Sequence, residues 1–186
     1  FFMSRKYRIR DQEKLYFVTF TVVEWIDLFT RQEYRDIFLE SLKYCQSNKG
    51  LEVAAYCIMS SHVHLILGRN GDQKLEDIIR DLKKFTSVKF VEAMQSLSVE
   101  SRKNWLLYHF RLAGKINANN SNFQIWQQHS HPIELNTQDK ITRCLNYIHQ
   151  NPVVSGLVLS PEEYLYSSAK NYAGHPDLLI DVILID

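Results

Sequence analysis

Residues 51–68 read LEVAAYCIMSSHVHLILG and carry the clearest structural signal of this 186-residue chain. Two short apolar runs, 51–59 and 62–68, flank a pair of serines, and this pattern predicts two strands joined by a tight turn. Side chains alternate across a strand, so His62 and His64 are expected to point to the same side of the second strand. The hairpin therefore places two imidazoles next to each other on one face of a sheet.

The segments on either side of this hairpin predict one further strand and two long helices. Residues 15–23 are aromatic and β-branched, which is typical of a strand. Apolar residues recur three and four positions apart at 31–48 and 75–94, which predicts two amphipathic helices. The order strand, helix, strand, strand, helix predicts an α+β fold, a ferredoxin-like split β-α-β sandwich whose antiparallel sheet carries its helices on one face. The other face would then be free for chemistry or nucleic acid.

The second half of the chain combines an irregular region with one clear helix. Residues 96–136 show no sustained periodicity, although 123–127 suits a short strand or a turn. Residues 137–151 predict a third helix that Pro152 ends, because the residue before a proline avoids the α conformation. Residues 152–186 then form a C-terminal extension.

Length and composition fit one globular unit. The chain is expected to form a single catalytic domain over residues 1–186, with 45% apolar and 23% charged residues. Its net charge is only +1, but the basic N-terminal arm, 1–14, carries +3, residues 80–115 carry +5 and residues 160–186 carry −4. This distribution allows a polarised surface with one side for a polyanion, although ordinary solvated faces explain the same charges.

Cysteine usage and hydropathy describe the expected environment. The three cysteines, Cys45, Cys57 and Cys144, are scattered through apolar stretches, which is typical of free thiols in a reducing cytosol. No apolar run approaches the roughly 20 residues that span a bilayer. We therefore expect no membrane partner.

Paired histidines occur twice in the chain. His62 and His64 lie on a predicted strand, where two imidazoles on the same face are within reach of one metal ion; the alternative is two polar residues on the solvated face of an edge strand. His129 and His131 precede Pro132 in the irregular region, and a loop does not enforce the same geometry. The second pair is therefore interpreted as a structural or substrate-contacting feature more than as a primary metal site.

The third predicted helix carries a polar stripe beside its apolar one. Arg143, Tyr147 and Asn151 lie four residues apart and therefore stack on one face. The Asn151 amide oxygen is a hard metal ligand, and the Arg143 cation could lower the phenol pKa or hold a phosphate. The alternative is a half-buried Tyr147 that hydrogen-bonds to a neighbour.

Four sequence blocks, in this order, resemble a known family. They are 56–67 (YCIMSSHVHLIL), 81–87 (DLKKFTS), 123–135 (FQIWQQHSHPIEL) and 147–157 (YIHQNPVVSGL). The chain resembles the IS200-like single-tyrosine transposases, a superfamily named for its histidine–hydrophobic–histidine motif. Within that superfamily it is most similar to the REP-associated tyrosine transposases. The resemblance extends from about residue 17 to about residue 173.

This resemblance implies a role for each matching residue. His62 and His64 correspond to paired metal ligands, Tyr147 to the nucleophile, and Asn151 to a third ligand that relatives often supply as glutamine. The implied enzyme is a metal-dependent single-strand DNA endonuclease and strand transferase with a 5′-phosphotyrosine intermediate. The cofactor would be Mg²⁺ or Mn²⁺, with imidazoles favouring Mn²⁺. His149 would be either a proton relay or simply a motif residue.

The resemblance also implies the partner, single-stranded DNA with a hairpin, and a cytoplasmic, nucleoid-associated location of prokaryotic type. Basic side chains would contact phosphates, and aromatic or histidine side chains would contact bases or the backbone. The predicted DNA-binding residues are Arg80, Lys83, Lys84, Lys89, Arg111, Trp126, His129, His131 and Arg143.

Several alternatives stay open at this point. The chain could be a DNA- or RNA-hairpin-binding protein of the same fold without cleavage, or an unrelated metallohydrolase that uses water. A homodimer is one arrangement to consider, with Tyr147 acting on its own chain or on a partner. The sequence also leaves open whether the protein moves DNA or has been domesticated.

Overall fold

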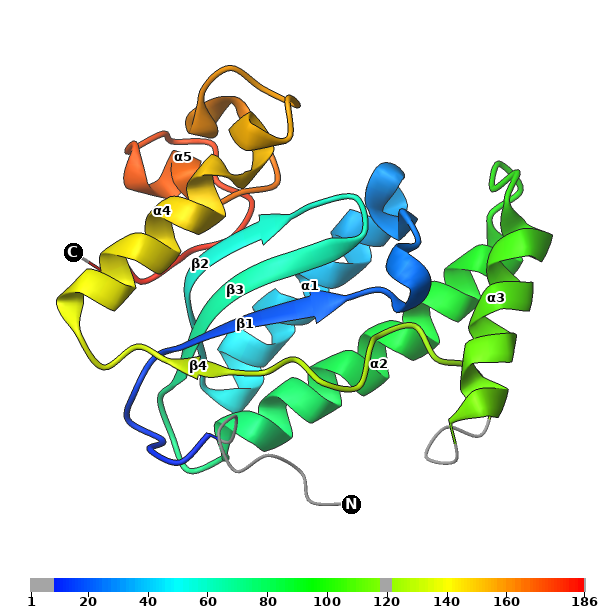
Figure 1. Cartoon of the computed structure of the whole chain (residues 1–186), viewed down its shortest axis with the longest axis horizontal. Coiled ribbons are helices and arrows are strands. Elements are labelled where there is room, and N and C mark those ends of the chain that lie inside the picture. The colour runs from blue at the N-terminus through cyan, green and yellow to red at the C-terminus, as the bar shows by residue number, and fades with distance from the viewer. Residues whose placement is uncertain (1–8, 118–121, 186) are drawn as a thin grey trace.

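The computed structural model describes residues 9–117 and 122–185, and within these residues four strands form one antiparallel sheet in the order β2-β3-β1-β4 (Figure 1). The sheet and the two helices between its strands are β1 (Tyr16–Thr21), α1 (Gln32–Lys49), β2 (Leu51–Ile58), β3 (His62–Arg69), α2 (Leu75–Ser96) and β4 (Ile133–Glu134). This strand order, with α1 and α2 as the connections, is the ferredoxin-like arrangement, so the predicted fold class is confirmed. Most of the predicted basic N-terminal arm, residues 1–8, lies outside the described residues.

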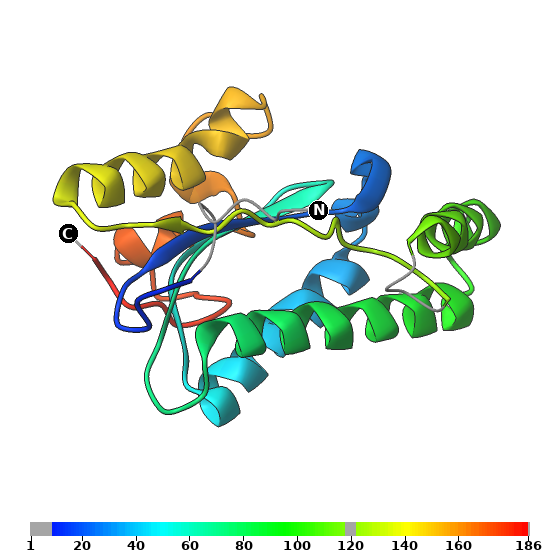
Figure 2. The same ribbon diagram turned by 60° about the horizontal axis from the view of Figure 1, so that its bottom comes forward.

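The main core lies between the sheet and the pair α1 and α2, which cover the same face (Figure 2). Alternate side chains of β1, among them Val18 and Phe20, point into it and are almost completely buried. Phe38 of α1 and Phe90 of α2 meet them there, and both are fully buried. Each such side chain stabilises the fold by roughly 1.5–3 kcal/mol. Because the core requires apolar residues at these positions, the strands and helices show a clear apolar spacing in the sequence.

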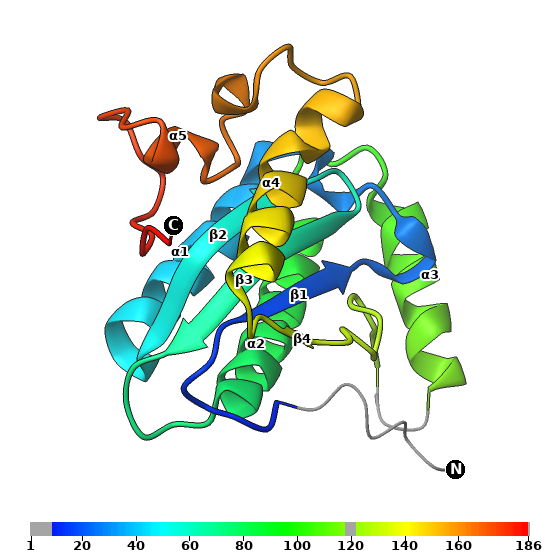
Figure 3. The same cartoon turned by 60° about the vertical axis from the view of Figure 1, so that its left-hand side comes forward.

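The third predicted helix, α4 (Gln138–Val154), lies across the opposite face of the sheet and contacts β2 and β3 (Figure 3). Ile148 of α4 packs in a second apolar cluster with Ala55 and Cys57 of β2 and Ile66 of β3. The small side chains of β2 let the helix approach closely. The face expected to be free is therefore partly covered by α4.

The end of α4 corrects one prediction. The helix does not end at Asn151 but continues through Pro152 to Val154. Proline lacks the N–H that would donate to the carbonyl four residues earlier and its ring crowds that carbonyl, but Pro152 lies in the last turn, so little of the helix follows the disruption. The stop is set by Gly156, which has a left-handed φ of 71°, while the N–H groups of Gly156 and Leu157 donate to the carbonyls of Val153 and Pro152. This is a Schellman motif.

The region predicted to be irregular contains a helix, α3 (Lys103–Ile116). Its buried side includes Leu106 and Phe110, but its outer side carries the exposed aromatics Trp105 and Tyr108. Apolar residues on both sides blur the helical period, which explains the missed helix. The stretch 123–127 is extended chain next to β1, with one isolated bridge between Trp126 and Val22.

Short 3-10 helices and the C-terminal extension complete the described chain. They are η2 (Val23–Trp25), η3 (Leu28–Thr30), η4 (Pro161–Glu163) and the short helix α5 (Ala169–Tyr172). The extension runs beside the outer edge of β2, where the Ile58 N–H donates to the carbonyl of Tyr166 and the Ser168 N–H donates to that of Tyr56. No helix among the described residues has both the length and the apolar character required to cross a bilayer.

Candidate active site

The paired histidines lie side by side at the beginning of β3, on the sheet face that carries α4. Their ring centroids are 4.6 Å apart. In the sheet, His62 lies opposite Thr21 of β1 and His64 lies opposite Thr19, and the close approach of the two rings shows that both side chains lie on one side of β3. The predicted same-face geometry of the histidines is therefore present.

His64 is held firmly in place. It is only 5% exposed, its Nδ1 atom lies 2.9 Å from Thr19 Oγ1, and its ring stacks on Phe17 at 5.7 Å between centroids. Its other nitrogen, Nε2, lies 3.4 Å from the side-chain amide of Asn151 on α4. The Thr19 contact fixes the orientation of the ring, so that Nε2 faces the space below α4.

The His62 ring also has a hydroxyl next to its Nδ1 atom, which comes from Ser61 in the turn between β2 and β3. Its Nδ1 atom lies 3.2 Å from Ser61 Oγ, and the Trp25 ring meets the imidazole edge to face at 5.5 Å. Burial lowers the pKa of His62, and burial followed by the proximity of His62 lowers the pKa of His64 to about 3. Both imidazoles are therefore neutral near pH 7, which is the form that binds metals.

Tyr147 reaches this pair from α4. Its ring centroid is 5.0 Å from that of His64 and 6.0 Å from that of Phe17, yet the side chain is 51% exposed. Asn151 follows one helical turn later and therefore lies on the same side of α4. One chain thus brings together His62, His64, Tyr147 and Asn151, which are the four residues singled out in the sequence for chemistry.

His149 does not join this group. Its Nε2 atom lies 2.9 Å from Ser168 Oγ, and the same hydroxyl accepts the Tyr56 N–H at 3.0 Å. Burial lowers the pKa of His149 to about 4. The ring therefore connects α4 to the C-terminal extension and β2, and it is turned away from the position that a proton relay to Tyr147 would need.

A metal at this site would depend on the Asn151 amide. Among residues 9–117 and 122–185, no three His, Cys, Asp or Glu side chains come together closely enough to hold an ion. Two oriented neutral imidazoles and one amide oxygen nevertheless form a donor set that a divalent cation accepts, with water or substrate oxygens completing the shell.

The basic residues predicted for DNA binding lie mostly on α2, away from these histidines. Arg80, Lys83 and Lys84 line a groove of about 1270 Å³ between α2 and the extended chain at 122–132. Arg80 pairs with two aspartates, and Lys89 further along α2 pairs with Glu92. Because α2 covers the other side of the sheet, the structure does not bring this set together with the tyrosine.

Two members of the predicted DNA-binding set are largely inside the protein. Trp126 is 4% exposed and donates its indole N–H to Thr86 Oγ1 at 3.0 Å, so the prediction that it stacks on unpaired bases is wrong. The Lys83 ammonium donates to the carbonyl of Gln127 at 2.7 Å and lies over the ring of Phe20. Burial lowers the pKa of Lys83 to about 8. Lys83 therefore attaches the extended chain at 122–132 to α2.

The remaining predicted contacts lie at the surface in three places. His129 and His131 are exposed in the loop beside β1, with ring centroids 5.8 Å apart. Arg111 of α3 lies over the ring of Phe123 at 5.2 Å. Arg143 is exposed on α4 and pairs with Asp139.

Trp25 is a neighbour of the site that the sequence analysis missed. It contacts His62 and is 60% exposed. The predicted strand ended just before it, and no periodic pattern includes it. Its one sequence signal is that it is an aromatic residue two positions after the end of the predicted strand.

Comparisons with known proteins place this geometry in a family. The model of the family described as "Transposase IS200 like" matches residues 15–110, slightly more than half of the chain. The chain belongs to the IS200-like transposase family, and it is a transposase, an enzyme that binds DNA and acts in DNA transposition. The matched range includes His62 and His64 and ends before Tyr147. No curated protein sequence matches the chain.

Solved structures are also similar to this chain. A REP-associated tyrosine transposase, solved bound to a REP hairpin, has 18% sequence identity and a TM-score of 0.61, and the match covers 99% of this chain and 94% of that one. A putative transposase from Deinococcus radiodurans R1 has 15% identity and a TM-score of 0.46, with 81% of this chain and 95% of that one covered. At this identity, the first likeness shows the shared fold.

Proposed function

We propose that this transposase is a metal-dependent single-strand DNA endonuclease and strand transferase whose nucleophile is Tyr147. The observation that carries the proposal is the meeting of the half-exposed Tyr147 ring with the His64 imidazole, 5.0 Å apart and 83 residues apart in sequence. A tyrosine at this position is open to a DNA strand on one side and close to neutral imidazoles on the other.

The proposed reaction is an in-line displacement at phosphorus. A bond forms between Tyr147 Oη and the phosphorus, and the bond from phosphorus to the 3′ oxygen breaks. The phenol loses its proton, and the leaving 3′ oxygen gains one to become a free hydroxyl. The fragment downstream of the break stays linked to Tyr147 through its 5′ phosphate, and this phosphotyrosine keeps the phosphodiester energy for a second 3′ end to reverse the step.

His62, His64 and Asn151 would hold the divalent cation, Mg²⁺ or Mn²⁺, and the two imidazoles favour Mn²⁺. When bound, such a cation supplies positive charge that offsets the charge developing on the phosphoryl oxygens. The Thr19 and Ser61 hydroxyls lie next to the Nδ1 atoms and would fix the ring orientations, so that each ring presents its Nε2 atom to the cation.

The proposed substrate is single-stranded DNA next to a hairpin. The similar transposase was solved bound to a REP hairpin, and this chain shares its fold over almost its whole length. The exposed side chains Arg80 and Lys84 on the groove beside α2, together with Arg143 on α4, would bind phosphates of this substrate.

The test is covalent capture of a labelled strand. A hairpin oligonucleotide with single-stranded flanks is incubated with Mn²⁺, and the product is resolved under denaturing conditions. We expect a protein–DNA adduct in the wild type and in Tyr108→Phe, a matched exposed tyrosine, but not in Tyr147→Phe. Tight binding without an adduct in the wild type would favour the non-cleaving hairpin-binding alternative. Cleavage that persists in Tyr147→Phe would favour a hydrolase that uses water.

A further inference from the structure

We propose that Trp25 is a base-stacking residue of the active site, which receives a base flanking the cleaved phosphodiester. This assignment rests on the proposed function, because it takes the His62–Tyr147 region as the place where a DNA strand lies. It assigns a substrate contact to η2, the short 3-10 helix that follows β1.

The exposure of Trp25 is the first argument. Tryptophan is highly buried on average, yet this indole is 60% exposed although it contacts His62, a candidate metal ligand. The two rings meet at an interplanar angle of 74°, so the indole does not lie flat on the imidazole. At least one face of the indole is therefore open to a planar ligand beside the candidate site.

The backbone at this position is the second argument. Glu24 and Trp25 have φ values of 56° and 55°, so two consecutive non-glycine residues adopt the left-handed conformation. Left-handed non-glycine residues are costly and persist only where surrounding contacts impose them; such residues concentrate at functional sites. Without this turn, the chain leaving β1 would not project Trp25 beside His62.

Two other elements hold the turn in place. The Glu24 carboxylate lies 2.7 Å from His109 Nδ1 on α3. The Val23 N–H donates to the carbonyl of Ile125 at 2.8 Å, and the Trp25 N–H donates to that of Val22 at 3.0 Å. The indole is therefore presented on an anchored support, which suits a preorganised binding surface.

The open face of the Trp25 indole is suited to an unpaired DNA base. An exposed aromatic ring beside a single-strand cleavage site stacks on an unpaired base, and stacking tolerates every base because each has a π face. Stacking next to the reacting phosphate would fix the strand relative to Tyr147. The alternative role, in which Trp25 only supports His62, predicts no dependence on a base.

The first experiment measures stacking without cleavage. In a Tyr147→Phe background, 2-aminopurine is placed in turn at each position of the single-stranded flank of a hairpin oligonucleotide. We expect fluorescence quenching on binding at one position, its loss in Trp25→Ala with affinity weakened by about tenfold, and its retention in Trp25→Phe. Tyr44→Ala removes another exposed aromatic, on α1 across the sheet, and should change neither signal. Unchanged quenching and affinity in Trp25→Ala would overturn the assignment.

The second experiment separates stacking from support of His62. Adduct formation by the Tyr147-containing enzyme is measured on the intact strand and on one with an abasic site at the quenched position. We expect Trp25→Ala to slow the reaction by about tenfold on the intact strand and hardly at all on the abasic one. An equal loss on both strands would overturn the stacking role. Because the fluorescence assay does not need cleavage, a wild type that forms no adduct would count against the proposed function alone.

Discussion

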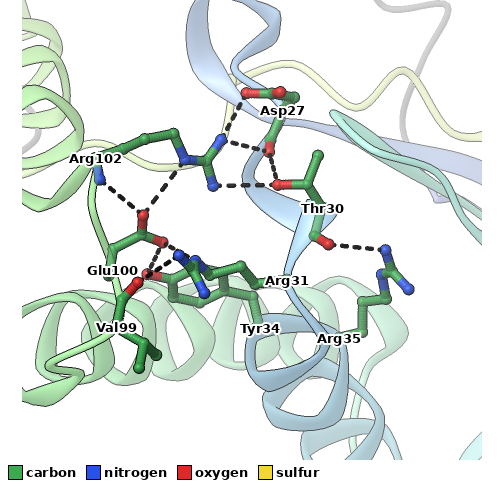
Figure 4. A network of polar contacts seen from close by, with 8 residues as sticks. All are labelled: Asp27, Thr30, Arg31, Tyr34, Arg35, Val99, Glu100 and Arg102. Atoms are coloured by element: carbon green, nitrogen blue, oxygen red, sulfur yellow. Dashed lines mark hydrogen bonds and ion pairs between the residues drawn. The ribbon is translucent and has the colours of Figure 1, made fainter.

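Two polar clusters in this protein differ in how completely they satisfy their own members. One surrounds the buried carboxylate of Glu100 between α1, η3 and the chain leading into α3, and Figure 4 shows its dense set of mutual contacts. The other surrounds His64 between β3 and α4. In the first cluster the polar groups bind one another. In the second, His64 Nε2 and the Asn151 amide face each other next to the half-exposed Tyr147.

The Glu100 cluster uses nearly every polar atom it contains. One carboxylate oxygen accepts the Arg102 N–H at 3.0 Å, and the other accepts the Tyr34 hydroxyl at 3.0 Å and lies 3.0 Å from Arg31 Nε. Arg102 then reaches Asp27 at 2.9 Å. Such a network has little capacity left for a ligand, and its role is to attach the α2–α3 connection to the beginning of α1.

The His64 cluster has the opposite design. Hydrogen bonds occupy the Nδ1 sides of the two imidazoles, and the Nε2 side of His64 faces Asn151 at 3.4 Å, longer than a good hydrogen bond. Tyr147 beside it is half exposed. The comparison teaches that a buried polar cluster indicates function when its orientation is fixed and its donors are not consumed by one another.

Glu100→Gln should have the largest effect on stability. It removes the one anion shared by two partly buried guanidinium groups, and we expect the free energy of unfolding to fall by about 3 kcal/mol. Urea unfolding of the purified variant measures this. Glu92→Gln, which changes an exposed carboxylate of α2, serves as the matched control and should stay within about 0.5 kcal/mol of the wild type. A Glu100 variant as stable as this control would contradict the structural role.

The Glu100 cluster should also give stability a defined pH dependence. Burial raises the pKa of the Glu100 carboxyl, but hydrogen bonds from the Arg102 N–H, from Tyr34 and from the Arg102 guanidinium outweigh it, so the pKa lies below its ordinary value. The folded pKa is below the unfolded one of about 4.3. The contribution is therefore complete above that value and is lost as pH falls through the folded pKa. Urea midpoints from pH 7 to pH 3 should fall more in the wild type than in Glu100→Gln.

His64→Ala should reduce activity much more than stability. Adduct formation is expected to fall by at least about 100-fold, because a ligand is lost. Stability should fall by about 2 kcal/mol, less than in Glu100→Gln, because the buried ring loses its packing on Phe17 and the Thr19 hydroxyl loses a partner, but no buried charge is left unpaired. His175→Ala, an exposed histidine of the C-terminal extension, is the control for both measurements. A His64 variant that is strongly unfolded but, where folded, fully active would reverse the assignment of the two clusters.

Thr19→Val should produce an intermediate effect. Valine keeps the shape of threonine but removes the hydroxyl that lies 2.9 Å from His64 Nδ1. Outer partners of metal-binding histidines typically contribute 10–100-fold to affinity, so the Mn²⁺ concentration needed for half-maximal adduct formation should rise by about tenfold. The maximal rate at saturating Mn²⁺ should change less. Equal loss at all Mn²⁺ concentrations would indicate that Thr19 acts by another route.

Arg143→Ala should have the smallest effect. The side chain is exposed and pairs with Asp139 on the helix surface, so stability should change by less than about 0.5 kcal/mol. If the arginine contacts a phosphate, affinity for the hairpin strand should fall a few-fold and its salt dependence should decrease by about one ion. Identical salt slopes in the variant and the wild type would remove Arg143 from the set of proposed phosphate contacts.

The sequence predicted the parts of the fold that follow from local periodicity. The hairpin at 51–68, the same-face pair His62 and His64, and the positions of α1 and α2 all reflect alternation or helical spacing. The end of α4 differs from the prediction because Pro152 does not end the helix, whereas Gly156 supplies the left-handed residue that the helix end requires.

Features that depend on distant segments were beyond a local pattern. Trp126 looked like a surface aromatic, but residues from α1 and α2 enclose it. Thr19 acts on His64 from a strand 45 residues away, and Glu24, which precedes Trp25, is held by His109 of α3. The four chemical residues were identified because a family resemblance added what spacing alone did not provide.

Complementation between two inactive variants tests the central claim most directly, namely that the imidazoles and the phenol of one chain form one site. Tyr147→Phe and His64→Ala are mixed in equal amounts with the labelled hairpin strand and Mn²⁺, and wild type diluted to the same extent with either variant is the positive control. The account predicts an adduct in the control and none in the mixture. An adduct that appears in the mixture, on the His64→Ala chain, would show that the tyrosine serves the imidazoles of another chain and would contradict it.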